Sequence, residues 1–543
     1  MTSRFAPWAV LLLALLSFGI GLAELPVQDR DEARFAQAAR QMAETGDLID
    51  IRLLDQPRHN KPALIYWAQS AAIWLTGAEG TTPIWVHRLP SYLAGVFSAF
   101  ALIWAGTPLV GRRAAILAGI MCATVYMLHA EARTAKTDAA LLLSVILAMG
   151  ALGHIWMGKA RSVLTPAIFW TAMAAGFLLK GPMVALPVLG AILWCSAFAR
   201  DLRWLAALRP LPGMVWMLAL TTPWFIAITI VTDGAFWSAS LGTDLTDKIT
   251  TEGEHSGSPP GLYLLTIWLT FWPWSVILPM AAIVGWRGRK RPDIAFLLGW
   301  LVPAWLVFEA VPVKLLHYTL PLYPPLMLLG AVALWQLAEG EMRFRRWIAA
   351  LGGFGFLLGL GAFTAALIAA PWIYGDAVPW LAWFGAAITL LAGFGALISL
   401  WRAELTQSVT CLALAGIIVG WTLSAVSLPA STDLRLAKRI ATAMAQHTCF
   451  APPVALAGFS EPSAAFYMGG EVVFLDTETA FDYLAAETGR SVWIDARRLD
   501  DAPPPGVPEI TEIDGLNFAN FREVTMRLFV SPGVPAPAEP CSS

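Results

Sequence analysis

The sequence predicts a mainly α-helical polytopic membrane protein, with about thirteen transmembrane helices, outer juxtamembrane helices and a small C-terminal α/β domain. Three observations predict this class. Of the 543 residues, 57% are hydrophobic and only 14% are charged, whereas soluble domains are about 25% charged. Apolar segments of bilayer-spanning length recur through the first 428 residues. After them, short apolar strands alternate with helical segments, a pattern typical of an α/β domain.

The predicted spans are near-continuous apolar segments separated by turns or short polar loops. They lie near residues 7–24, 88–110, 114–129, 138–157, 164–179, 181–199, 213–232, 261–285, 293–311, 316–337, 347–371, 378–400 and 408–428. The first span is interpreted as a retained anchor, because a polytopic chain needs one. A cleaved signal peptide ending near Ala23 is the alternative.

Positive charge fixes the predicted orientation. If Arg4 is cytoplasmic, fifteen Arg and Lys residues fall in short inner loops and five in short outer connections, as the positive-inside rule requires. The net charge of −2 gives no basic excess that would indicate a nucleic-acid partner. An odd number of spans places everything after about residue 429 on the outer side.

Two domains follow from this topology. Residues 1–428 form the transmembrane domain, whose large outer loops are 25–87 and 233–260. Residues 429–543 form the outer α/β domain, with strands expected at 454–457, 472–475, 492–494 and 521–529. In an oxidising compartment Cys449 and Cys541 of this domain could form a disulfide, but their spacing does not establish the pair.

The first outer loop carries the densest cluster of charge. Residues 28–42 predict an amphipathic helix lying in the membrane interface, with Asp31 and Arg34 on its polar side. Arg34 and the later Lys61 could clamp a phosphate, and Asp31 could accept a proton from a hydroxyl. Helix capping, a local Asp31–Arg34 pair and snorkelling of Lys61 are the structural alternatives.

Further polar residues are predicted to converge on the same outer rim. They form the expected substrate pocket: Glu32, Arg58, His59, Asn60, Arg133, Asp138, Lys180, His255, Lys314, His317 and Tyr318. Asp138 also fits a helix cap. Intramembrane or rim charges are costly and are usually kept for function, so their grouping on one face favours an active site.

A divalent metal is one reading of the outer histidines. Glu254 and His255, with His59 and His317, would offer carboxylate and imidazole ligands. No fixed ligand spacing supports this site, and solvated loop histidines are the alternative. Nucleotide-binding glycine motifs are absent from the sequence. No cofactor is therefore assigned.

The ordered motifs resemble the bacterial aminoarabinose transferases of lipid A, which belong with the protein O-mannosyltransferases among C-type membrane glycosyltransferases. The motifs are Asp31-Glu32-Ala33-Arg34-Phe35-Ala36, Gly46-Asp47, Lys61-Pro62, Arg133 with Asp138, Lys180-Gly181-Pro182, Glu254-His255 and Lys314-x-x-His317-Tyr318-x-Leu320-Pro321. In the tail, Gly458-Phe459-Ser460-Glu461-Pro462-Ser463 and Asn517-Phe518 are also similar to the family.

This resemblance implies an enzyme of the bacterial inner membrane with a periplasmic active site and C-terminal domain. The donor would be a sugar on a polyprenyl phosphate such as undecaprenyl phosphate. Asp31 would be the catalytic carboxylate, and Arg34 and Lys61 would hold the donor phosphate. One departure stands out: the family often has Glu before Lys-Pro, where this sequence has Asn60. The missing carboxylate weakens both a metal site and a specific assignment to aminoarabinose.

The resulting hypothesis is a glycosyltransferase that moves a sugar from a polyprenyl-phosphate donor to lipid A, lipopolysaccharide core or another periplasmic acceptor. A protein O-mannosyltransferase-like enzyme with a hydroxyl acceptor is one alternative. A transporter is another, although it would need polar residues at mid-membrane depth. A non-catalytic protein that binds polyprenyl lipids also remains open, because a phosphate clamp can bind without turnover.

Overall fold

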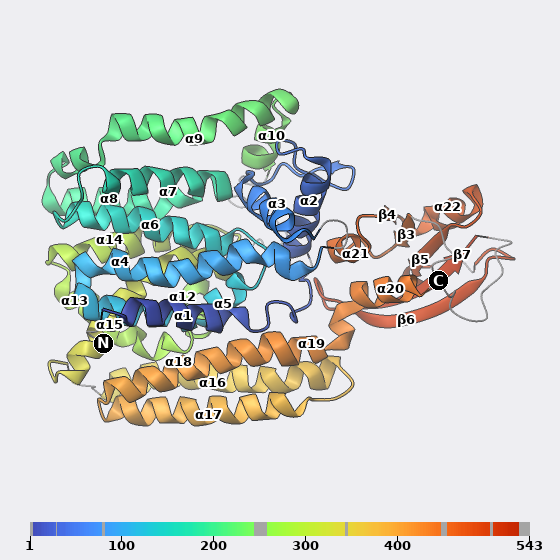
Figure 1. The fold of residues 1–543 in the computed structure, drawn as a ribbon. Coiled ribbons are helices and arrows are strands. Elements are labelled where there is room, and N and C mark those ends of the chain that lie inside the picture. The colour runs from blue at the N-terminus through green and yellow to red at the C-terminus, as the bar shows by residue number, and fades with distance from the viewer. Residues whose placement is uncertain are drawn as a thin grey trace.

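The structure, a computed structural model, consists of a long helical bundle with a sheet domain at one end (Figure 1). It describes residues 4–28, 30–78, 82–243, 258–342, 346–446, 453–499 and 503–531. The first helix, α1 (Ala6–Gly19), begins at the end of the bundle farthest from the sheet domain, and the last strand, β7 (Arg522–Val530), lies in that domain (Figure 1). The predicted fold class, a helical membrane protein with a small C-terminal α/β domain, is confirmed.

The helices of the bundle follow one another through most of the chain. They are α1 (Ala6–Gly19), α4 (Ile84–Thr124), α6 (Asp138–Trp156), α7 (Leu164–Lys180), α8 (Ala185–Ala199), α9 (Pro210–Val231), α12 (Leu262–Thr270), α13 (Leu278–Gly288), α14 (Pro292–Ala310), α15 (Tyr323–Ala338), α16 (Arg346–Tyr374), α17 (Trp380–Trp401) and α18 (Leu405–Thr422). Within the described residues, nine helical segments are long and apolar enough to cross a membrane. The count of thirteen spans stays a prediction.

Two predicted spans lie within the single element α4. Gly111 interrupts the helix with φ 78° and ψ 159°, a conformation that glycine adopts without steric cost. After Gly111 the chain folds back, as the packing of Gly119 against Ala99 and Ile103 shows. The two halves of α4 are therefore antiparallel neighbours.

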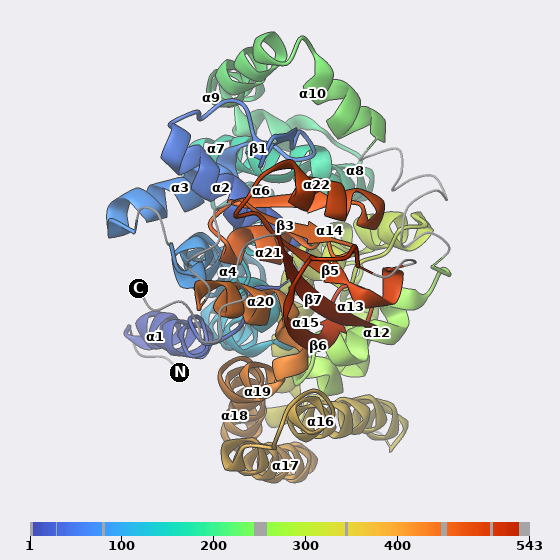
Figure 2. The ribbon, with the colours of Figure 1, turned by 90° about the vertical axis from the view of Figure 1, so that its right-hand side faces the viewer.

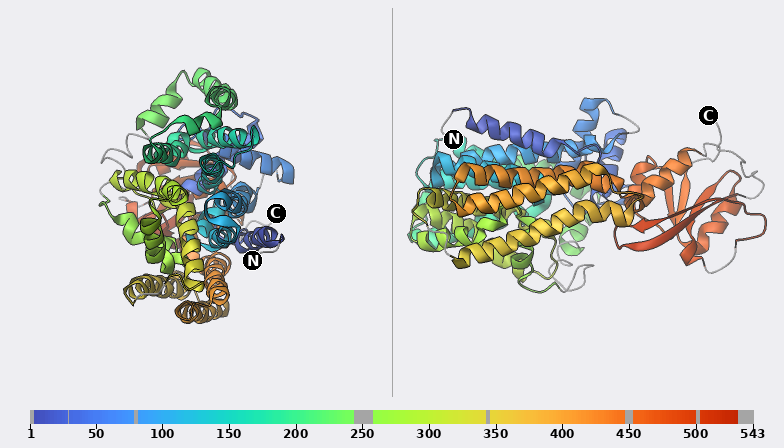
Figure 3. Two further views of the ribbon diagram at one scale, coloured as in Figure 1. Left: turned by 90° about the vertical axis from the view of Figure 1, so that its left-hand side faces the viewer. Right: turned by 90° about the horizontal axis from the view of Figure 1, so that it is seen from below.

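The bundle buries aromatic side chains inside and presents apolar ones outside. Trp272, Trp274 and Trp300 are fully buried in the central core, whereas Leu211 and Leu391 are more than 70% exposed. A soluble monomer rarely exposes such extended apolar surface, but a bilayer covers it. Two further views show the helices side by side around this core (Figure 3).

Short elements cover the end of the bundle next to the sheet domain (Figure 2). They are α2 (Asp31–Thr45), the hairpin of β1 (Arg52–Leu53) and β2 (Gln56–Pro57), α3 (Leu64–Thr76), α5 (Tyr126–Ala132), α10 (Ala235–Trp237), and the 3-10 segments η1 (Gly181–Val184) and η5 (Leu316–Leu322). We call this the rim end. The opposite end carries the connections predicted to be cytoplasmic.

The C-terminal domain is a five-stranded sheet packed with short helices. Its elements are α20 (Leu436–Ala445), β3 (Val454–Ala457), α21 (Pro462–Tyr467), β4 (Val472–Leu475), α22 (Ala480–Ala486), β5 (Ser491–Asp495), β6 (Glu509–Asn517) and β7 (Arg522–Val530). The strand order is β4-β3-β5-β7-β6; β4, β3 and β5 are parallel, and β7 pairs antiparallel with both neighbours. Strand β6 is absent from the strands predicted from the sequence, and its pairing with β7 has a register shift between Glu509 and Thr511.

Contacts between α21 and α2 dock this domain on the bundle. The Arg40 guanidinium donates to the Phe466 carbonyl at 2.8 Å and stacks over its ring at 4.2 Å. The Val27 N–H donates to the Tyr467 hydroxyl at 3.1 Å. The helix that carries Asp31 and Arg34 is thereby held between the bundle and the sheet domain.

Candidate functional site

Helix α2 is amphipathic as predicted, and it is covered more completely than expected. It begins at Asp31 and ends at Thr45, and the left-handed conformation of the capping Gly46 lets its N–H donate to the Met42 carbonyl. The predicted apolar stripe with Phe35 and Met42 is buried, and so is Ala38 on the other stripe. Asp31 stays exposed and Arg34 half-buried. The first turn therefore presents a carboxylate and a guanidinium at the rim end.

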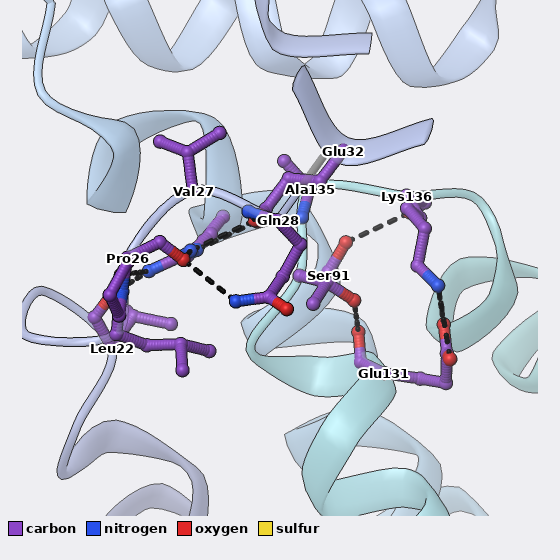
Figure 4. A network of polar contacts seen from close by, with 12 residues as sticks. Leu22, Pro26, Val27, Gln28, Glu32, Ser91, Glu131, Ala135 and Lys136 are labelled. Carbon is purple, nitrogen blue, oxygen red and sulfur yellow. Dashed lines mark hydrogen bonds and ion pairs between the residues drawn. The ribbon is translucent and has the colours of Figure 1, made fainter. Parts of the chain in front are cut away.

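Glu32 is buried and holds α2 in place (Figure 4). Its carboxylate accepts two hydrogen bonds from the fully buried Arg88, at 2.8 and 2.9 Å. It also accepts the Gln28 and Ala135 N–H groups at 2.7 and 2.8 Å. Arg88 in turn donates to the Leu22, Leu25 and Pro26 carbonyls. The structure thus places Glu32 in a buried ion pair that joins three segments.

Positive side chains gather beside Asp31. The pKa of Arg34 is lowered overall. Burial and the neighbouring charge of Arg58 lower it by more than the negative charges of Asp31 and Glu461 raise it. Arg58 lies 5.0 Å over the Phe35 ring and donates to the Tyr66 hydroxyl at 3.1 Å. These residues therefore form one electrostatic group, even though their sequence positions span more than 400 residues.

The 59–61 segment lies on the same end. His59 is buried, and its Nε2 lies 2.8 Å from the Asp50 carboxylate. Asn60 is exposed, and the Lys61 ammonium donates to the Asn60 carbonyl at 3.2 Å. His59 is thus held by the loop itself, whereas Lys61 reaches the loop surface.

A second charged cluster lies where α5, α6, α7 and η5 meet. Asp138 pairs with Lys180 at 2.6 Å, and Glu131 pairs with Lys136 at 3.1 Å. The His317 ring lies 3.8 Å from both carboxylates. We call these five residues the inner cluster. The Tyr318 ring borders it, 5.1 Å from the Lys180 ammonium.

Glu131 and Lys136 were absent from the predicted pocket. Burial alone would lower the pKa of Lys136, but the negative charges of Glu131, Asp138 and Asp31 together raise it above its usual value. Asp31 is therefore close enough to act on the inner cluster. The density of charge in residues 131–138 is the sequence signal that points to both Glu131 and Lys136.

Other predicted pocket residues make contacts elsewhere. Arg133 is buried and donates to the Ser17 and Ile20 carbonyls of the α1 segment and to His129. Lys314 donates to the Val311 and Ser258 carbonyls. Both side chains donate to backbone carbonyls at the rim end, so in this structure they stabilise the segments around the site.

The proposed metal ligands Glu254 and His255 lie outside the described residues. Among the residues that are described, no group of three or more His, Cys, Asp or Glu side chains is arranged to hold a metal ion. Cys449 and Cys541 also lie outside the described residues. The metal and the disulfide both stay predictions.

Known proteins share this fold. The crystal structure of ArnT from Cupriavidus metallidurans bound to undecaprenyl phosphate aligns with a TM-score of 0.78 at 20% identity, covering 97% of this chain and 98% of that one. The archaeal oligosaccharyltransferase AglB from Archaeoglobus fulgidus, in complex with an inhibitory peptide and a dolichol-phosphate, aligns with a TM-score of 0.54 at 12% identity, covering 91% and 70%. Both likenesses concern the fold.

Sequence comparison gives closer relationships. The undecaprenyl phosphate-alpha-4-amino-4-deoxy-L-arabinose arabinosyl transferase of Aeromonas salmonicida is 31% identical over 380 residues, covering 69% of this chain and 68% of the relative. The enzyme of the same name from Edwardsiella ictaluri is 29% identical over 381 residues, covering 68% and 66%. No protein-family model matches the chain.

The resemblance seen in the motifs is thus confirmed by a relative that matches more than two thirds of each chain. The protein belongs to the undecaprenyl phosphate-alpha-4-amino-4-deoxy-L-arabinose arabinosyl transferase family, a family of membrane glycosyltransferases that take their sugar from a lipid phosphate.

Proposed function

We propose that this protein transfers a sugar from undecaprenyl phosphate to lipid A, lipopolysaccharide core or another acceptor at the periplasmic face. The observation that carries the proposal is the first turn of α2. There an exposed carboxylate, Asp31, stands one turn from Arg34 and within electrostatic range of Lys136. The names of the relatives, which specify 4-amino-4-deoxy-L-arabinose, favour an aminopentose as the transferred sugar. Asn60, which stands where the family often has Glu before Lys-Pro, argues against that specific sugar.

The reaction requires charge to move onto a phosphate. An acceptor oxygen forms a bond to the anomeric carbon while the bond from that carbon to the donor phosphate oxygen breaks, with inversion at the carbon. The leaving lipid phosphate gains negative charge, which Arg34 as a planar fork and Lys61 as a point charge would stabilise. These two cations are the phosphate ligands of the proposal.

Asp31 takes one of two roles according to the acceptor. A hydroxyl acceptor loses its proton as the new bond forms, and the Asp31 carboxylate would receive it. A phosphate acceptor is already ionised and needs no strong base, so Asp31 would then orient the cations around the donor. Its exposure at the start of α2 suits either role, because an exposed carboxylate is accessible to substrate.

The inner cluster would bind the hydroxyl or amino groups of the sugar. Its carboxylates and ammonium groups are paired and nearly excluded from solvent, so they offer fixed donors and acceptors without a large net charge. His317 and the bordering Tyr318 add an imidazole and an aromatic face. Glu32 and Arg133 would act indirectly, by holding α2 and α5 in place.

Purified protein in detergent, supplied with undecaprenyl-phosphate sugar and lipid A, provides the direct test. Arg34→Ala and Lys61→Ala should each reduce transfer at least a hundredfold while the far-ultraviolet circular dichroism is unchanged. The matched control Arg203→Ala removes a cation from the other end of the bundle, where its side chain is 92% exposed, and should retain full activity. Full activity of both site variants would overturn the assignment.

Product analysis identifies the acceptor. Mass spectrometry of lipid A and core from cells with and without the gene should show the loss of one sugar mass when the gene is deleted. Unchanged masses together with donor binding by the purified protein would instead support the non-catalytic lipid-binding alternative. A protein-linked sugar would support the alternative with a hydroxyl acceptor.

A further inference from the structure

A polar groove lies beside α20, away from the rim site. Its volume is about 410 Å³. Its polar lining consists of Thr432, Arg435, Lys438, Arg439, Thr442 and Gln446. We call it the α20 groove. Three cations, two hydroxyls and one amide give it many hydrogen-bond donors, which is the composition of an anion site.

The helix periodicity explains why these donors share one side. Residues 435, 438, 439, 442 and 446 recur at intervals of three and four, so they form a stripe along α20. Leu436, Ala437 and Ile440 turn the other way and are buried in the domain core. Core packing therefore accounts for the apolar face of α20 and leaves the basic stripe unexplained.

The charge of the stripe contrasts with its domain. Residues 429–543 contain fifteen Asp and Glu residues but only eight Arg and Lys residues, and three of those eight lie in this groove. Elsewhere in the domain, arginines pair with nearby carboxylates, as Arg527 does with Glu512 and Arg497 with Glu523. A concentration of positive charge in an acidic domain indicates a local anionic ligand.

Arg435 is a member of the groove whose hydrogen-bonding capacity is incompletely used. Its Nε is buried and has no hydrogen-bond partner among the described residues. Arg439 is better satisfied, since it donates to the Asp514 carbonyl at 2.6 Å and lies 3.4 Å from Asp433. A buried donor without an acceptor costs free energy, so the described residues satisfy the guanidinium of Arg435 incompletely, although Arg435 lines the groove.

The location of the groove identifies the source of the anion. The last candidate membrane span ends at Ala430, and the groove begins at Thr432. Lipid phosphates lie at this depth, just beyond the hydrocarbon. An extended soluble polyanion would instead approach across the acidic surface of the domain, which repels it.

We propose that the α20 groove binds the phosphate headgroup of a membrane lipid, in the leaflet of the bilayer that faces the C-terminal domain. This site is separate from the donor-phosphate ligands Arg34 and Lys61. Arg435 and Arg439 contact the phosphate as hydrogen-bonding forks, and Lys438 adds a point charge. Because α20 packs on α21 and α21 packs on α2, a bound lipid also steadies the docking of the domain on the catalytic helix.

The test uses the full-length protein in detergent and soluble short-chain lipids. To remove the proposed donor site, it is done in an Arg34→Ala/Lys61→Ala background, so failure of the proposed function does not affect the readout. Dioctanoyl phosphatidic acid should bind saturably and raise the unfolding temperature. Dioctanoylglycerol, which lacks the phosphate, should not bind. Inorganic phosphate alone should bind at least tenfold more weakly.

Substitutions then locate the site. Arg435→Gln/Lys438→Gln/Arg439→Gln should weaken phosphatidic acid binding at least tenfold. The matched triple variant Arg490→Gln/Arg497→Gln/Arg527→Gln removes three cations from elsewhere in the same domain and should bind normally. Lys438→Gln alone changes one exposed side chain, and should weaken binding about threefold even if the triple variant fails to fold.

Three results would overturn the proposal. One is equal affinity of Lys438→Gln and its parent. Another is equal affinity for dioctanoylglycerol, which would make the interaction a purely apolar one. The last is equal affinity for inorganic phosphate, which would make the groove a site for free anions.

Discussion

Lys136 and Glu131 form a buried ion pair at the centre of the inner cluster. Their side chains are only 16% and 6% exposed, and removing one partner of a buried pair costs about 3–5 kcal/mol. Lys136→Met should therefore lower the free energy of unfolding by about this amount. Because the pKa of Lys136 is raised, the pair's contribution persists below the usual lysine pKa and is lost only as the pH rises through the higher value.

Urea unfolding of the detergent-solubilised protein measures this effect. Arg527→Met breaks pairs in which both partners are about 40% exposed, and it should change stability by less than about 1 kcal/mol. If Lys136→Met were as stable as this control, the pair would not be a buried structural element. Transfer by the variant should also fall, since the inner cluster is proposed to bind the sugar and the charge of Asp31 acts on Lys136.

A second residue-level prediction concerns Tyr66. Burial raises the pKa of its hydroxyl, so the group stays protonated and its oxygen accepts from Arg58. Tyr66→Phe removes this acceptor but keeps the ring that packs on Phe35. Transfer should fall about tenfold because Arg58 becomes free to move, while stability changes by only about 1 kcal/mol. Steady-state kinetics with purified protein would check this, and an unchanged rate would exclude a role for the Arg58–Tyr66 contact.

Individual site residues were predictable from the sequence only where charge interrupts apolar segments. Asp31, Arg34, Asp138, Lys180 and His317 stand out for this reason, and the structure places all of them at the rim end. Arg88 was not recognised, because it begins a predicted span and its partner Glu32 lies 56 positions away. Nothing local in the sequence reveals such a pair.

At the scale of elements, two adjacent glycines of α16 make opposite predictions. A side chain at Gly352 would meet the Val276 backbone carbonyl, whereas nothing lies within 4 Å of the equivalent point at Gly353. Gly352→Ala should therefore force α16 away from η4 (Trp274–Ile277) and destabilise the protein. Gly353→Ala should be neutral or stabilising by up to about 1 kcal/mol.

Thermal unfolding in detergent compares the two variants. The contrast is informative because the substitutions are chemically identical and occupy consecutive positions of one helix. Equal unfolding temperatures would show that α16 does not pack against η4 as closely as the structure indicates. A lower unfolding temperature for Gly353→Ala alone would show that Gly353, and not Gly352, faces the packed side of α16.

Hydropathy located the elements well but not their breaks. The predicted span 261–285 is divided into α12 and α13, and Pro273 between them lacks the N–H that a continuous helix needs. The fold-back of α4 at Gly111 agrees with the two predicted spans, because arginines 112 and 113 mark the turn. Strand β6 was missed since its apolar residues are interrupted by carboxylates.

At the scale of the whole molecule, Arg40 couples the two domains. It donates to the Phe466 and Thr82 carbonyls at 2.8 and 3.2 Å. Hydrogen bonds from a charged group contribute about 1.5–3 kcal/mol. Arg40→Met should therefore weaken the docking of α21 on α2, increase trypsin cleavage between the domains and reduce transfer. Arg497→Met, which alters an exposed pair, should leave the cleavage rate unchanged.

The predicted orientation of the whole chain rests on where its charges and its domains lie. The sheet domain and the elements that carry the site residues share one end of the bundle (Figure 1). The short loops predicted to be cytoplasmic, which carry fifteen Arg and Lys residues against five in the short outer connections, belong to the other end. Positive charge is retained in the cytoplasm during insertion. The rim end, Asp31 and the C-terminal domain should therefore face the periplasm.

Reporter fusions test this orientation. Alkaline phosphatase, which folds only outside the cytoplasm, should be active when fused after residue 531 and inactive when fused after residue 404, between α17 and α18. Green fluorescent protein should give the opposite pattern. The two fusion points are separated by the single helical segment Leu405–Ala430, so their reporters must differ if that segment crosses the membrane. Active phosphatase at residue 404 would invert the topology and place the proposed site in the cytoplasm, which would contradict transfer at the periplasmic face.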